Sequence, residues 1–218
     1  MGGFKNDSLN TVFYDSVLNI IITHLIKCSK RMNAFYAASN TPLENDEDII
    51  TNRLVHTFLN AEPNAFRYEP QKSEHFDETT GRYIGRADIT VISGDYFNDA
   101  KAYHIIECKR IDGSKILNRK YVSEGVSRFL SPVASPKYSS FYRQNIMFGY
   151  VVKTIDIPSN TKKLEELQKQ ILGNGIAGDF LLAYSHDSDY YVYSCEYKSN
   201  VSYIELMHLF YDFADAIF

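Results

Sequence analysis

Two neighbouring apolar segments, each interrupted by charge, constrain the fold of this chain more than any other feature. The first, residues 82–93, reads RYIGRADITVIS and carries a single acid, Asp88. The second, residues 101–111, reads KAYHIIECKRI and passes from an apolar run into the charged sequence ECKR. Branched and aromatic residues recur in both segments, and the turn-rich loop GDYFNDA joins them. This pattern is typical of two strands of one sheet.

The alternation of side chains along a strand decides which of these charges can meet. Glu107 and Lys109 are two residues apart and therefore share a face, whereas Cys108 points to the other face. If the two strands pair, Asp88 and Glu107 can converge. Two adjacent carboxylates repel each other, and a divalent cation relieves the repulsion. Mg²⁺ prefers carboxylates and carbonyl oxygens, so we expect Asp88, Glu107 and the backbone carbonyl of Cys108 as ligands.

Lys109 lies beside this expected metal site. Its ammonium could orient a metal-bound water and stabilise the negative charge that develops on a phosphate. The alternative is structural, because a Glu-x-Lys sequence at a strand end is common and is usually a solvated salt bridge. Asp88 favours the chemical interpretation, since a carboxylate in an otherwise apolar strand needs a partner or a metal.

The order of these residues resembles the PD-(D/E)xK phosphodiesterase superfamily, which includes many restriction endonucleases, resolvases and repair exonucleases. Asp88, a loop and the sequence IIECK at 105–109 match its short motif, although Ala87 stands where the motif has proline. The resemblance covers about residues 42–155. Its specificity comes from the context of the motif, which is a helix, a strand, the Asp-bearing strand, the Glu-x-Lys strand and another helix.

The resemblance implies both a fold and an activity. The fold is restriction-endonuclease-like, with helices flanking a central mixed sheet. The activity is that of a Mg²⁺-dependent deoxyribonuclease, with Asp88, Glu107 and Lys109 as catalytic residues and Mn²⁺ able to substitute. Similar uncharacterised sequences suggest an effector of a prokaryotic defence or restriction system. The alternatives are a catalytically silent relative that binds nucleic acid or helps assembly, and a helical interaction module in which the motif is a coincidence.

Residues 41–60 are expected to form a helix capped by Thr41, and the superfamily often places an additional acid on this helix. The segment offers four candidates: Glu44, Asp46, Glu47 and Asp48. An apolar stripe recurs at spacings of seven, four and four residues, at Leu43, Ile50, Leu54 and Phe58. Glu47 fills the gap in this stripe, so we expect it to face the sheet as an outer metal or water ligand. Alternatively, all four acids form a solvated first turn that the helix dipole favours.

The stretch from Lys101 to Arg143 is basic within an acidic chain. It holds nine basic and three acidic residues, whereas the whole chain has a formal charge of −4. A basic segment directly after a metal site is where a phosphate backbone would lie. The candidates for binding nucleic acid, most simply DNA, are Arg110, Lys115, Arg119, Lys120, Arg128, Arg143 and Gln144. The alternative is an ordinary lysine-rich surface.

The remaining segments are expected to fold around the same sheet. Helices are expected at 9–38, 118–130, 138–153, 161–172 and 201–217, and strands at 65–71, 179–186 and 190–197. This order indicates an α/β or α+β fold with one mixed sheet. We expect a single nuclease-like domain over 1–218, with 1–40 as an N-terminal helical extension. The apolar helix of this extension is expected to pack on a second copy of the chain or on a partner subunit.

Cysteine usage and the N-terminus bear on the compartment. The three cysteines are far apart and odd in number, which indicates reduced thiols in an intracellular protein. The N-terminus lacks the basic region and apolar core of a signal peptide. The most apolar run, residues 17–26, is too short to span a bilayer. We therefore expect a cytoplasmic protein without a membrane partner.

Overall fold

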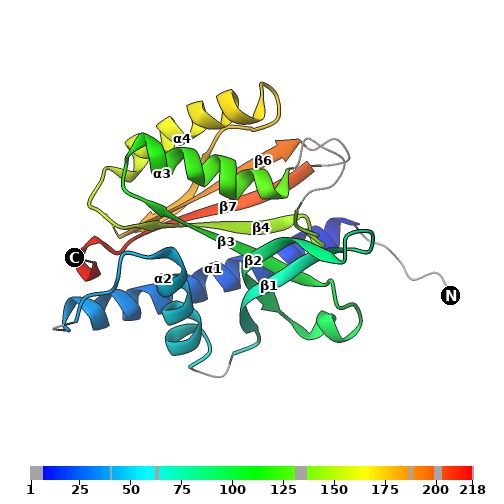
Figure 1. Cartoon of the computed structure of the whole chain (residues 1–218), viewed down its shortest axis with the longest axis horizontal. Coiled ribbons are helices and arrows are strands. Elements are labelled where there is room, and N and C mark those ends of the chain that lie inside the picture. The colour runs from blue at the N-terminus through cyan, green and yellow to red at the C-terminus, as the bar shows by residue number, and fades with distance from the viewer. Residues whose placement is uncertain are drawn as a thin grey trace.

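The computed structural model describes residues 7–39, 41–61, 64–130, 137–186, 189–198 and 203–217. Seven strands form one mixed sheet with the order β1-β2-β3-β4-β7-β6-β5 (Figure 1). Their bounds are β1 Arg67–Asp77, β2 Arg82–Ile92, β3 Tyr103–Ile111, β4 Gln144–Val151, β5 Leu181–His186, β6 Tyr190–Lys198 and β7 Tyr203–Asp212. The helices are α1 Asp7–Ala37, α2 Glu47–Arg53, α3 Lys115–Lys120 and α4 Ile157–Leu172. Short helical turns extend α2 to Leu59 and α3 to Phe129.

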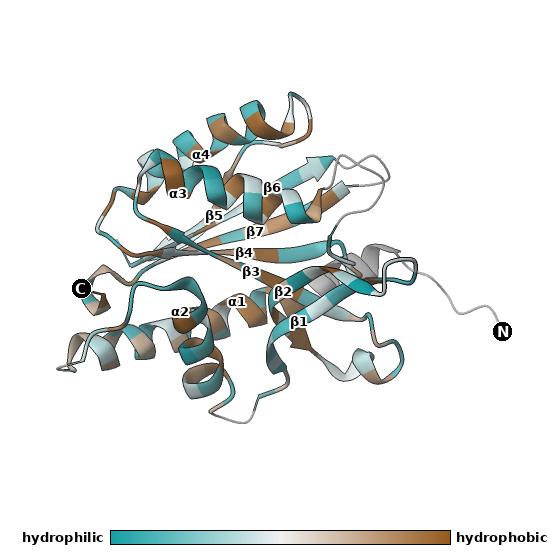
Figure 2. Ribbon diagram, viewed as in Figure 1, coloured by the Kyte–Doolittle hydropathy of each residue, from teal (hydrophilic) through white to brown (hydrophobic). Residues whose placement is uncertain are grey.

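Helices cover both faces of the sheet. α1 and α2 lie on one side of it, and α3 and α4 lie on the other (Figure 1). Each side has its own cluster of buried hydrophobic residues. Hydrophilic and hydrophobic residues alternate in bands along α4, as expected of a helix with one face on a sheet (Figure 2). The α/β class predicted from the order of elements is confirmed.

The strands predicted at 82–93 and 101–111 are present as β2 and β3, and they are direct neighbours in the sheet. β2 and β3 pair antiparallel from Ile89↔Ile106 to Ile92↔Tyr103. β3, β4 and β7 then run parallel to one another at the centre of the sheet. The charged end of β3 therefore lies at the place where the antiparallel half of the sheet meets its parallel centre.

The predicted helices at 138–153 and 201–217 are wrong, because most of each segment is a central strand. All eight residues of β4 are buried, and β7 is buried over most of its length. Strands covered on both faces have no reason to alternate polar and apolar residues, and their apolar runs resemble a buried helix. Packing is tight here, since a Cβ at Gly149 would lie 2.4 Å from the Phe210 ring.

The helix expected at 41–60 starts later than predicted. The N-cap is Asp46, whose carboxylate accepts a hydrogen bond from the backbone N–H of Ile49 at 3.1 Å. Thr41 is therefore not the cap, and Glu47 becomes the first helical residue. The helices expected at 118–130 and 161–172 are confirmed, each beginning a few residues earlier than predicted. The strands expected at 65–71, 179–186 and 190–197 are also present.

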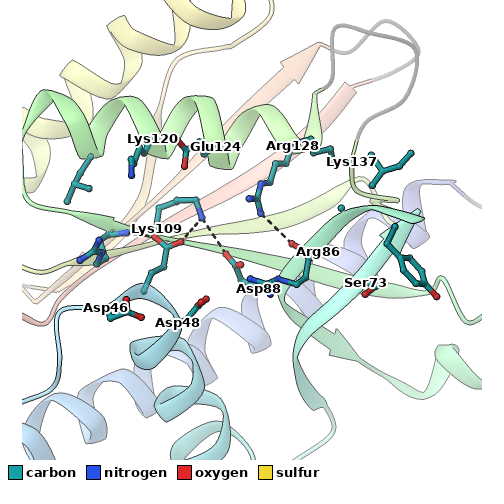
Figure 3. Close-up of a pocket in the computed structure, with 16 residues that line it drawn as sticks. Asp46, Asp48, Ser73, Arg86, Asp88, Lys109, Lys120, Glu124, Arg128 and Lys137 are labelled. Carbon is teal, nitrogen blue, oxygen red and sulfur yellow. Dashed lines mark hydrogen bonds and ion pairs between the residues drawn. The ribbon is translucent and has the colours of Figure 1, made fainter. Parts of the chain in front are cut away.

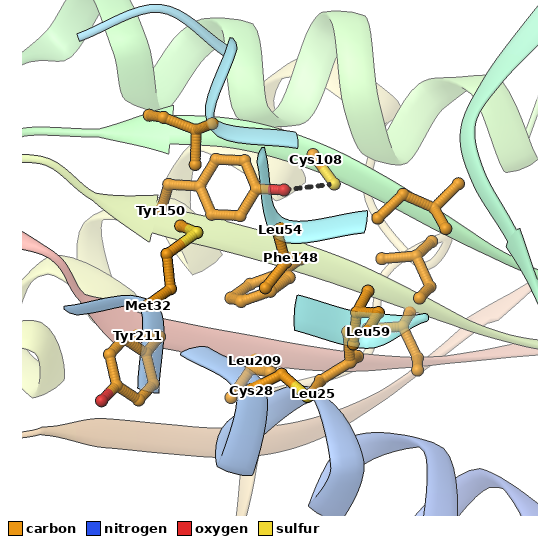
Figure 4. Packing of buried hydrophobic residues seen from close by; sticks show 14 of the residues in the cluster. Leu25, Cys28, Met32, Leu54, Leu59, Cys108, Phe148, Tyr150, Leu209 and Tyr211 are labelled. Atoms are coloured by element: carbon orange, nitrogen blue, oxygen red, sulfur yellow. Dashed lines mark hydrogen bonds between the residues drawn. The ribbon is translucent and has the colours of Figure 1, made fainter. Parts of the chain in front are cut away.

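α1 is a layer of the domain core and not an appendage. Its residues Leu18, Ile21, Leu25, Cys28 and Met32 are buried against the sheet. Figure 4 shows Leu25, Cys28 and Met32 beside side chains of β4 and β7. Because the chain's own sheet covers these apolar residues of α1, they do not indicate the second subunit that the sequence predicted. Residues 1–6 of the expected extension lie outside the described part.

Among the helices that the structure describes, none combines the length and the apolar character that a bilayer crossing requires.

Candidate active site

A cleft of about 630 Å³ opens where α2, the β1–β2 hairpin, β3 and α3 meet. Its two sides differ in charge (Figure 3). Acidic residues line the side of α2 and β2: Asp46, Glu47, Asp48 and Asp88. Mostly basic residues line the side of α3 and the segments that follow it, joined by one from β2: Lys120, Arg128, Lys137 and Arg86, with Glu124 as the one acid among them. Such a cleft suits a ligand that carries negative charge on one side and cations on the other.

The ammonium group of Lys109 lies at the bottom of the cleft, where three carboxylates converge. Its Nζ is 2.8 Å from Glu47 Oε1, 2.9 Å from Glu107 Oε1 and 3.6 Å from Asp88 Oδ2. Nζ also donates a hydrogen bond to the backbone carbonyl of Cys108 at 2.6 Å. The structure thus brings together the residues that the sequence predicted as catalytic and metal-binding, from three separate elements.

Glu47 reaches the site because α2 is fixed on the far face of β3. The Thr51 hydroxyl donates to the Glu47 carbonyl and lies 3.1 Å from the hydroxyl of Tyr150, which in turn donates to Cys108 Sγ at 3.0 Å. Glu47 Oε2 also accepts the backbone N–H of Arg110 at 3.2 Å. The apolar stripe predicted that Glu47 faces the sheet, and among the four acids it is Glu47 that contacts Lys109. Asp46 caps the helix, and Glu44 and Asp48 are exposed.

Asp88 marks the point at which β2 and β3 separate. The pairing of these strands ends at Ile89↔Ile106, and beyond it the cleft opens. Asp88 Oδ2 accepts the backbone N–H of Cys108 at 2.8 Å, taking up the donor that the departing strand leaves. An unpaired buried N–H is costly, so this bond helps to hold the Asp88 carboxylate beside Lys109.

Glu107 lies beneath Lys109 and is fully buried. Its Oε1 is 3.0 Å from Arg128 Nη1 as well as close to Lys109, and its Oε2 accepts a hydrogen bond from the Tyr138 hydroxyl. Burial and the charge of Asp88 raise the pKa of Glu107 to about 8, against the opposite influence of Lys109 and Arg128. This carboxyl group is therefore hydrogen-bonded by Tyr138, ion-paired with Lys109 and Arg128, and more deeply buried than the other two acids.

Lys109 stays positively charged in this environment. Burial lowers its pKa, but the nearby charges of Glu107, Asp88 and Glu47 outweigh burial and raise the pKa above its ordinary value. The turn after α3 packs closely on its stem, because a Cβ at Gly125 would lie 3.3 Å from Lys109 Cγ. The ammonium is thus a fixed cation within a group of oxygen ligands.

The oxygen atoms around this ammonium resemble the ligands of a divalent cation in chemistry but not in arrangement. Across the described residues, no group of three or more His, Cys, Asp or Glu side chains has the arrangement of a metal site. The donors are nevertheless hard oxygens, and they already surround a cation. Glu47 and Asp88 line the cleft, and the carbonyl of Cys108 lies beside them at Lys109 Nζ. In donor chemistry they fit Mg²⁺ or Mn²⁺.

The candidates for nucleic-acid binding divide into two groups. Arg110, Lys120 and Arg128 line the cleft. Outside its lining are Lys115, Arg119, Arg143 and Gln144. The last two lie at the start of β4, whereas the part of β4 beside Lys109 is Gly149. Gln144 was expected on a cleft-facing helix, and because that segment is a strand, its side chain instead bonds Glu205 at 2.9 Å.

Two contributors were missed in the sequence. Tyr138 follows a Pro/Ser-rich stretch and contacts Glu107 across 31 positions, and no local pattern indicates such a contact. Arg86 precedes Asp88 by two residues, so strand alternation could have placed it on the cleft side. Arg128 was expected to bind phosphate, and its guanidinium also neutralises Glu107.

Comparisons of the chain with protein-family models, curated proteins and solved structures found no match. The function therefore has to be argued from the geometry of the site.

Proposed function

We propose that this protein is a metal-dependent nuclease that hydrolyses phosphodiester bonds in DNA, with the restriction-endonuclease-like arrangement of the PD-(D/E)xK superfamily. The observation that carries the proposal is the convergence of Glu47, Asp88 and Glu107 on Lys109 at the bottom of a cleft with one acidic and one basic side. Strongly coupled ionisable groups in a cleft are typical of functional sites. Its place in a defence or restriction system rests on the sequence resemblance alone.

Each side of the cleft has a separate task in this proposal. A divalent cation held by Glu47, Asp88 and the Cys108 carbonyl would supply positive charge and make a water molecule more acidic. Lys120 and Arg128 would hold the phosphates of the substrate on the basic side. Lys109 is a preorganised donor for the charge that develops on the reacting phosphate. Glu107 was expected as a metal ligand, but it is fully buried and lies outside the cleft lining, so in this proposal it holds the ammonium from below and does not bind the metal.

A second function is favoured by one specific observation. Glu107 is fully buried, its Oε2 accepts a hydrogen bond from Tyr138, and its Oε1 lies at ion-pair distance from Lys109 and Arg128. The charge of this group is therefore compensated by protein cations without a metal. A catalytically silent relative that binds nucleic acid or helps an assembly would have the same contacts.

DNA cleavage in the presence and absence of metal separates the two functions. The purified chain is incubated with supercoiled plasmid and with linear DNA in Mg²⁺, in Mn²⁺ or in EDTA. We expect cleavage only with a divalent ion, and we expect Asp88→Asn to abolish it. Asp48→Asn is the matched control, because it removes one acid from the same cleft at an exposed position.

The outcomes are distinct. Cleavage that survives Asp88→Asn, or that persists in EDTA, would refute the nuclease proposal for this site. DNA binding without cleavage in either metal would favour the silent relative. Binding can be measured in parallel by fluorescence anisotropy with labelled DNA.

A further inference from the structure

The outer half of the β1–β2 hairpin stands free of the rest of the sheet. β1 and β2 pair from Arg67↔Ile92 to Asp77↔Arg82, whereas the pairing of β2 with β3 extends only from Ile92 to Ile89. Residues 71–88, which we call the arm, therefore continue beyond β3 along the edge of the cleft. Figure 3 shows Ser73 and Arg86 of the arm beside the basic and acidic side chains.

The arm exposes apolar side chains at this edge. Phe76, Tyr83 and Ile84 are 55%, 60% and 51% exposed, and none of them belongs to either buried cluster. The Phe76 and Tyr83 rings are cross-strand partners in a T-shaped contact, with centroids 5.2 Å apart. Tyr83 and Ile84 line the cleft itself. An aromatic ring and a branched side chain thus stand in water at the rim of a charged site.

The base of the arm is fixed to the body of the protein. Glu74, only 2% exposed, accepts hydrogen bonds from the Tyr103 hydroxyl and from the backbone N–H of Ser139, the latter at 2.9 Å. A Cβ at Gly85 would lie 2.4 Å from the carbonyl oxygen of Lys137, so the arm touches that segment directly. The Arg86 carbonyl accepts from Arg128 Nη1 at 3.4 Å. The exposed residues are therefore presented at a defined distance from the site.

We propose that the arm recognises an unpaired nucleobase, with the ring of Tyr83 stacked on the base. The inference rests on the proposed function, and it names the substrate class as single-stranded DNA or DNA with an unpaired stretch. In a duplex each base is covered on both faces by the base pairs above and below it. A protein ring beside the basic side of the cleft can therefore stack on a base only where the DNA is unpaired. Every base offers a face for such stacking, whatever its sequence.

The basic residues around the arm suit single-stranded DNA as the ligand. Arg86, Lys137 and Arg128 line the same cleft as Tyr83, and Lys137 and Arg128 contact the arm at Gly85 and at the Arg86 carbonyl. Aromatic side chains interleaved with basic ones are the combination that binds a single strand, since cations hold the backbone while rings hold the bases. A purely apolar protein partner would not match these cations.

The competing explanation is that the aromatic pair serves only the hairpin. Cross-strand aromatic pairs stabilise hairpins, so loss of Tyr83 would then lower stability without changing DNA binding. Tyr83→Thr removes the ring and keeps a residue that suits a strand, whereas Tyr83→Phe keeps the ring. Phe97→Thr is the matched control, because Phe97 is 91% exposed and lies outside the cleft lining.

The test is metal-free binding of the full chain, in EDTA, to a labelled single strand and to the blunt duplex of the same sequence. We expect the single strand to bind more tightly, and we expect Tyr83→Thr to weaken it by about 5- to 150-fold, the range for one stacked base. Tyr83→Phe and Phe97→Thr should bind as the unaltered protein does. A strand that contains 2-aminopurine should lose fluorescence on binding, and Tyr83→Thr should abolish that quenching.

The failures of the two proposals can be told apart, because binding and quenching need neither metal nor cleavage. If Lys137→Ala loses binding while Tyr83→Thr binds the single strand as the unaltered protein does, the arm inference is overturned. The nuclease proposal is not affected by that result. Quenching without cleavage in Mg²⁺ or Mn²⁺ refutes the nuclease and supports the arm. If Tyr83→Thr does not fold, absence of quenching in the unaltered protein overturns the inference by itself. A protein that binds no DNA overturns both.

Discussion

Two buried polar clusters on this sheet differ in charge and in access to water. The site cluster, Glu47, Asp88, Glu107, Lys109 and Arg128, is ionic and opens onto the cleft. The histidine cluster, Tyr121, Gln168, Tyr197 and His208, is neutral and sealed. His208 Nδ1 is 2.8 Å from the Tyr121 hydroxyl, and Nε2 is 3.0 Å from the Tyr197 hydroxyl. Burial lowers the pKa of His208 to about 3, so the ring is uncharged.

The comparison of the two clusters shows that buried charged groups, more than buried neutral polar groups, indicate a functional site. Neutral groups that satisfy one another in pairs can stabilise a core, and they need no contact with solvent. Buried charges are expensive, and an ion pair that only served stability could be replaced by apolar residues at little cost. The site cluster keeps its charges where β2 and β3 separate beside a cleft. We therefore assign chemistry to the ionic cluster and architecture to the neutral one.

The largest effect is expected from Lys109→Ala in the site cluster. Loss of a preorganised donor should lower the cleavage rate by about 10²- to 10³-fold. Without metal, three carboxylates also lose their cation, which should lower the free energy of unfolding by roughly 3–5 kcal/mol. Added Mg²⁺ should restore part of this stability but not the rate.

Cleavage assays and thermal unfolding with and without Mg²⁺ measure both effects. Lys163→Ala is the control, since this lysine is exposed on α4 and lies outside the cleft lining. Full cleavage by Lys109→Ala would contradict the assignment of chemistry to the site cluster.

A smaller effect, on stability alone, is expected from Tyr197→Phe in the histidine cluster. Loss of the hydroxyl leaves His208 Nε2 and Gln168 Oε1 without this partner inside the core. The free energy of unfolding should fall by about 1–3 kcal/mol. Cleavage per folded molecule should not change. Urea unfolding measures the loss, and Tyr203→Phe, at an exposed tyrosine, is the control; a change in the cleavage rate would argue against a purely architectural role.

The histidine cluster should also make stability depend on pH. The pKa of His208 is about 3 in the folded protein and about 6.5 when exposed, so the unfolded chain binds more protons between these values. Stability should therefore fall as the pH falls from 6.5 towards 3, by up to about 1.4 kcal/mol per pH unit from this residue. His208→Gln should show a flatter dependence in urea unfolding across this window. Equal slopes in both proteins would mean that His208 is not buried as a neutral ring.

The smallest effect is expected from Lys120→Ala at the rim of the site cluster. Removal of one phosphate contact should weaken DNA binding evenly across sequences and reduce the salt slope by about 1. Arg143→Ala is the matched control, because Arg143 belongs to the same basic stretch but lies at the start of β4, outside the cleft lining. Equal losses in both variants would mean that DNA follows the whole basic stretch and not the cleft.

Local patterns in the sequence were sufficient for the centre of the site. The alternation of β2 and β3 placed Glu107 and Lys109 on one face, and the apolar stripe around α2 selected Glu47 among four acids. These inferences hold because strand and helix periodicity are properties of neighbouring residues. The α/β class followed from the order of such elements.

Tertiary structure alone decided three other features. β4 and β7 are strands because their neighbours cover both faces, and burial on both faces removes the alternation that would identify them. Tyr138 and Arg128 bind Glu107 because the segment after α3 returns across the hairpin, over distances that no periodicity spans. The sequence alone could not tell which basic residues of the stretch Lys101 to Arg143 line the cleft, because that depends on how the chain folds around it. Sequence determines which charges lie on each face of a strand, and packing decides which faces meet.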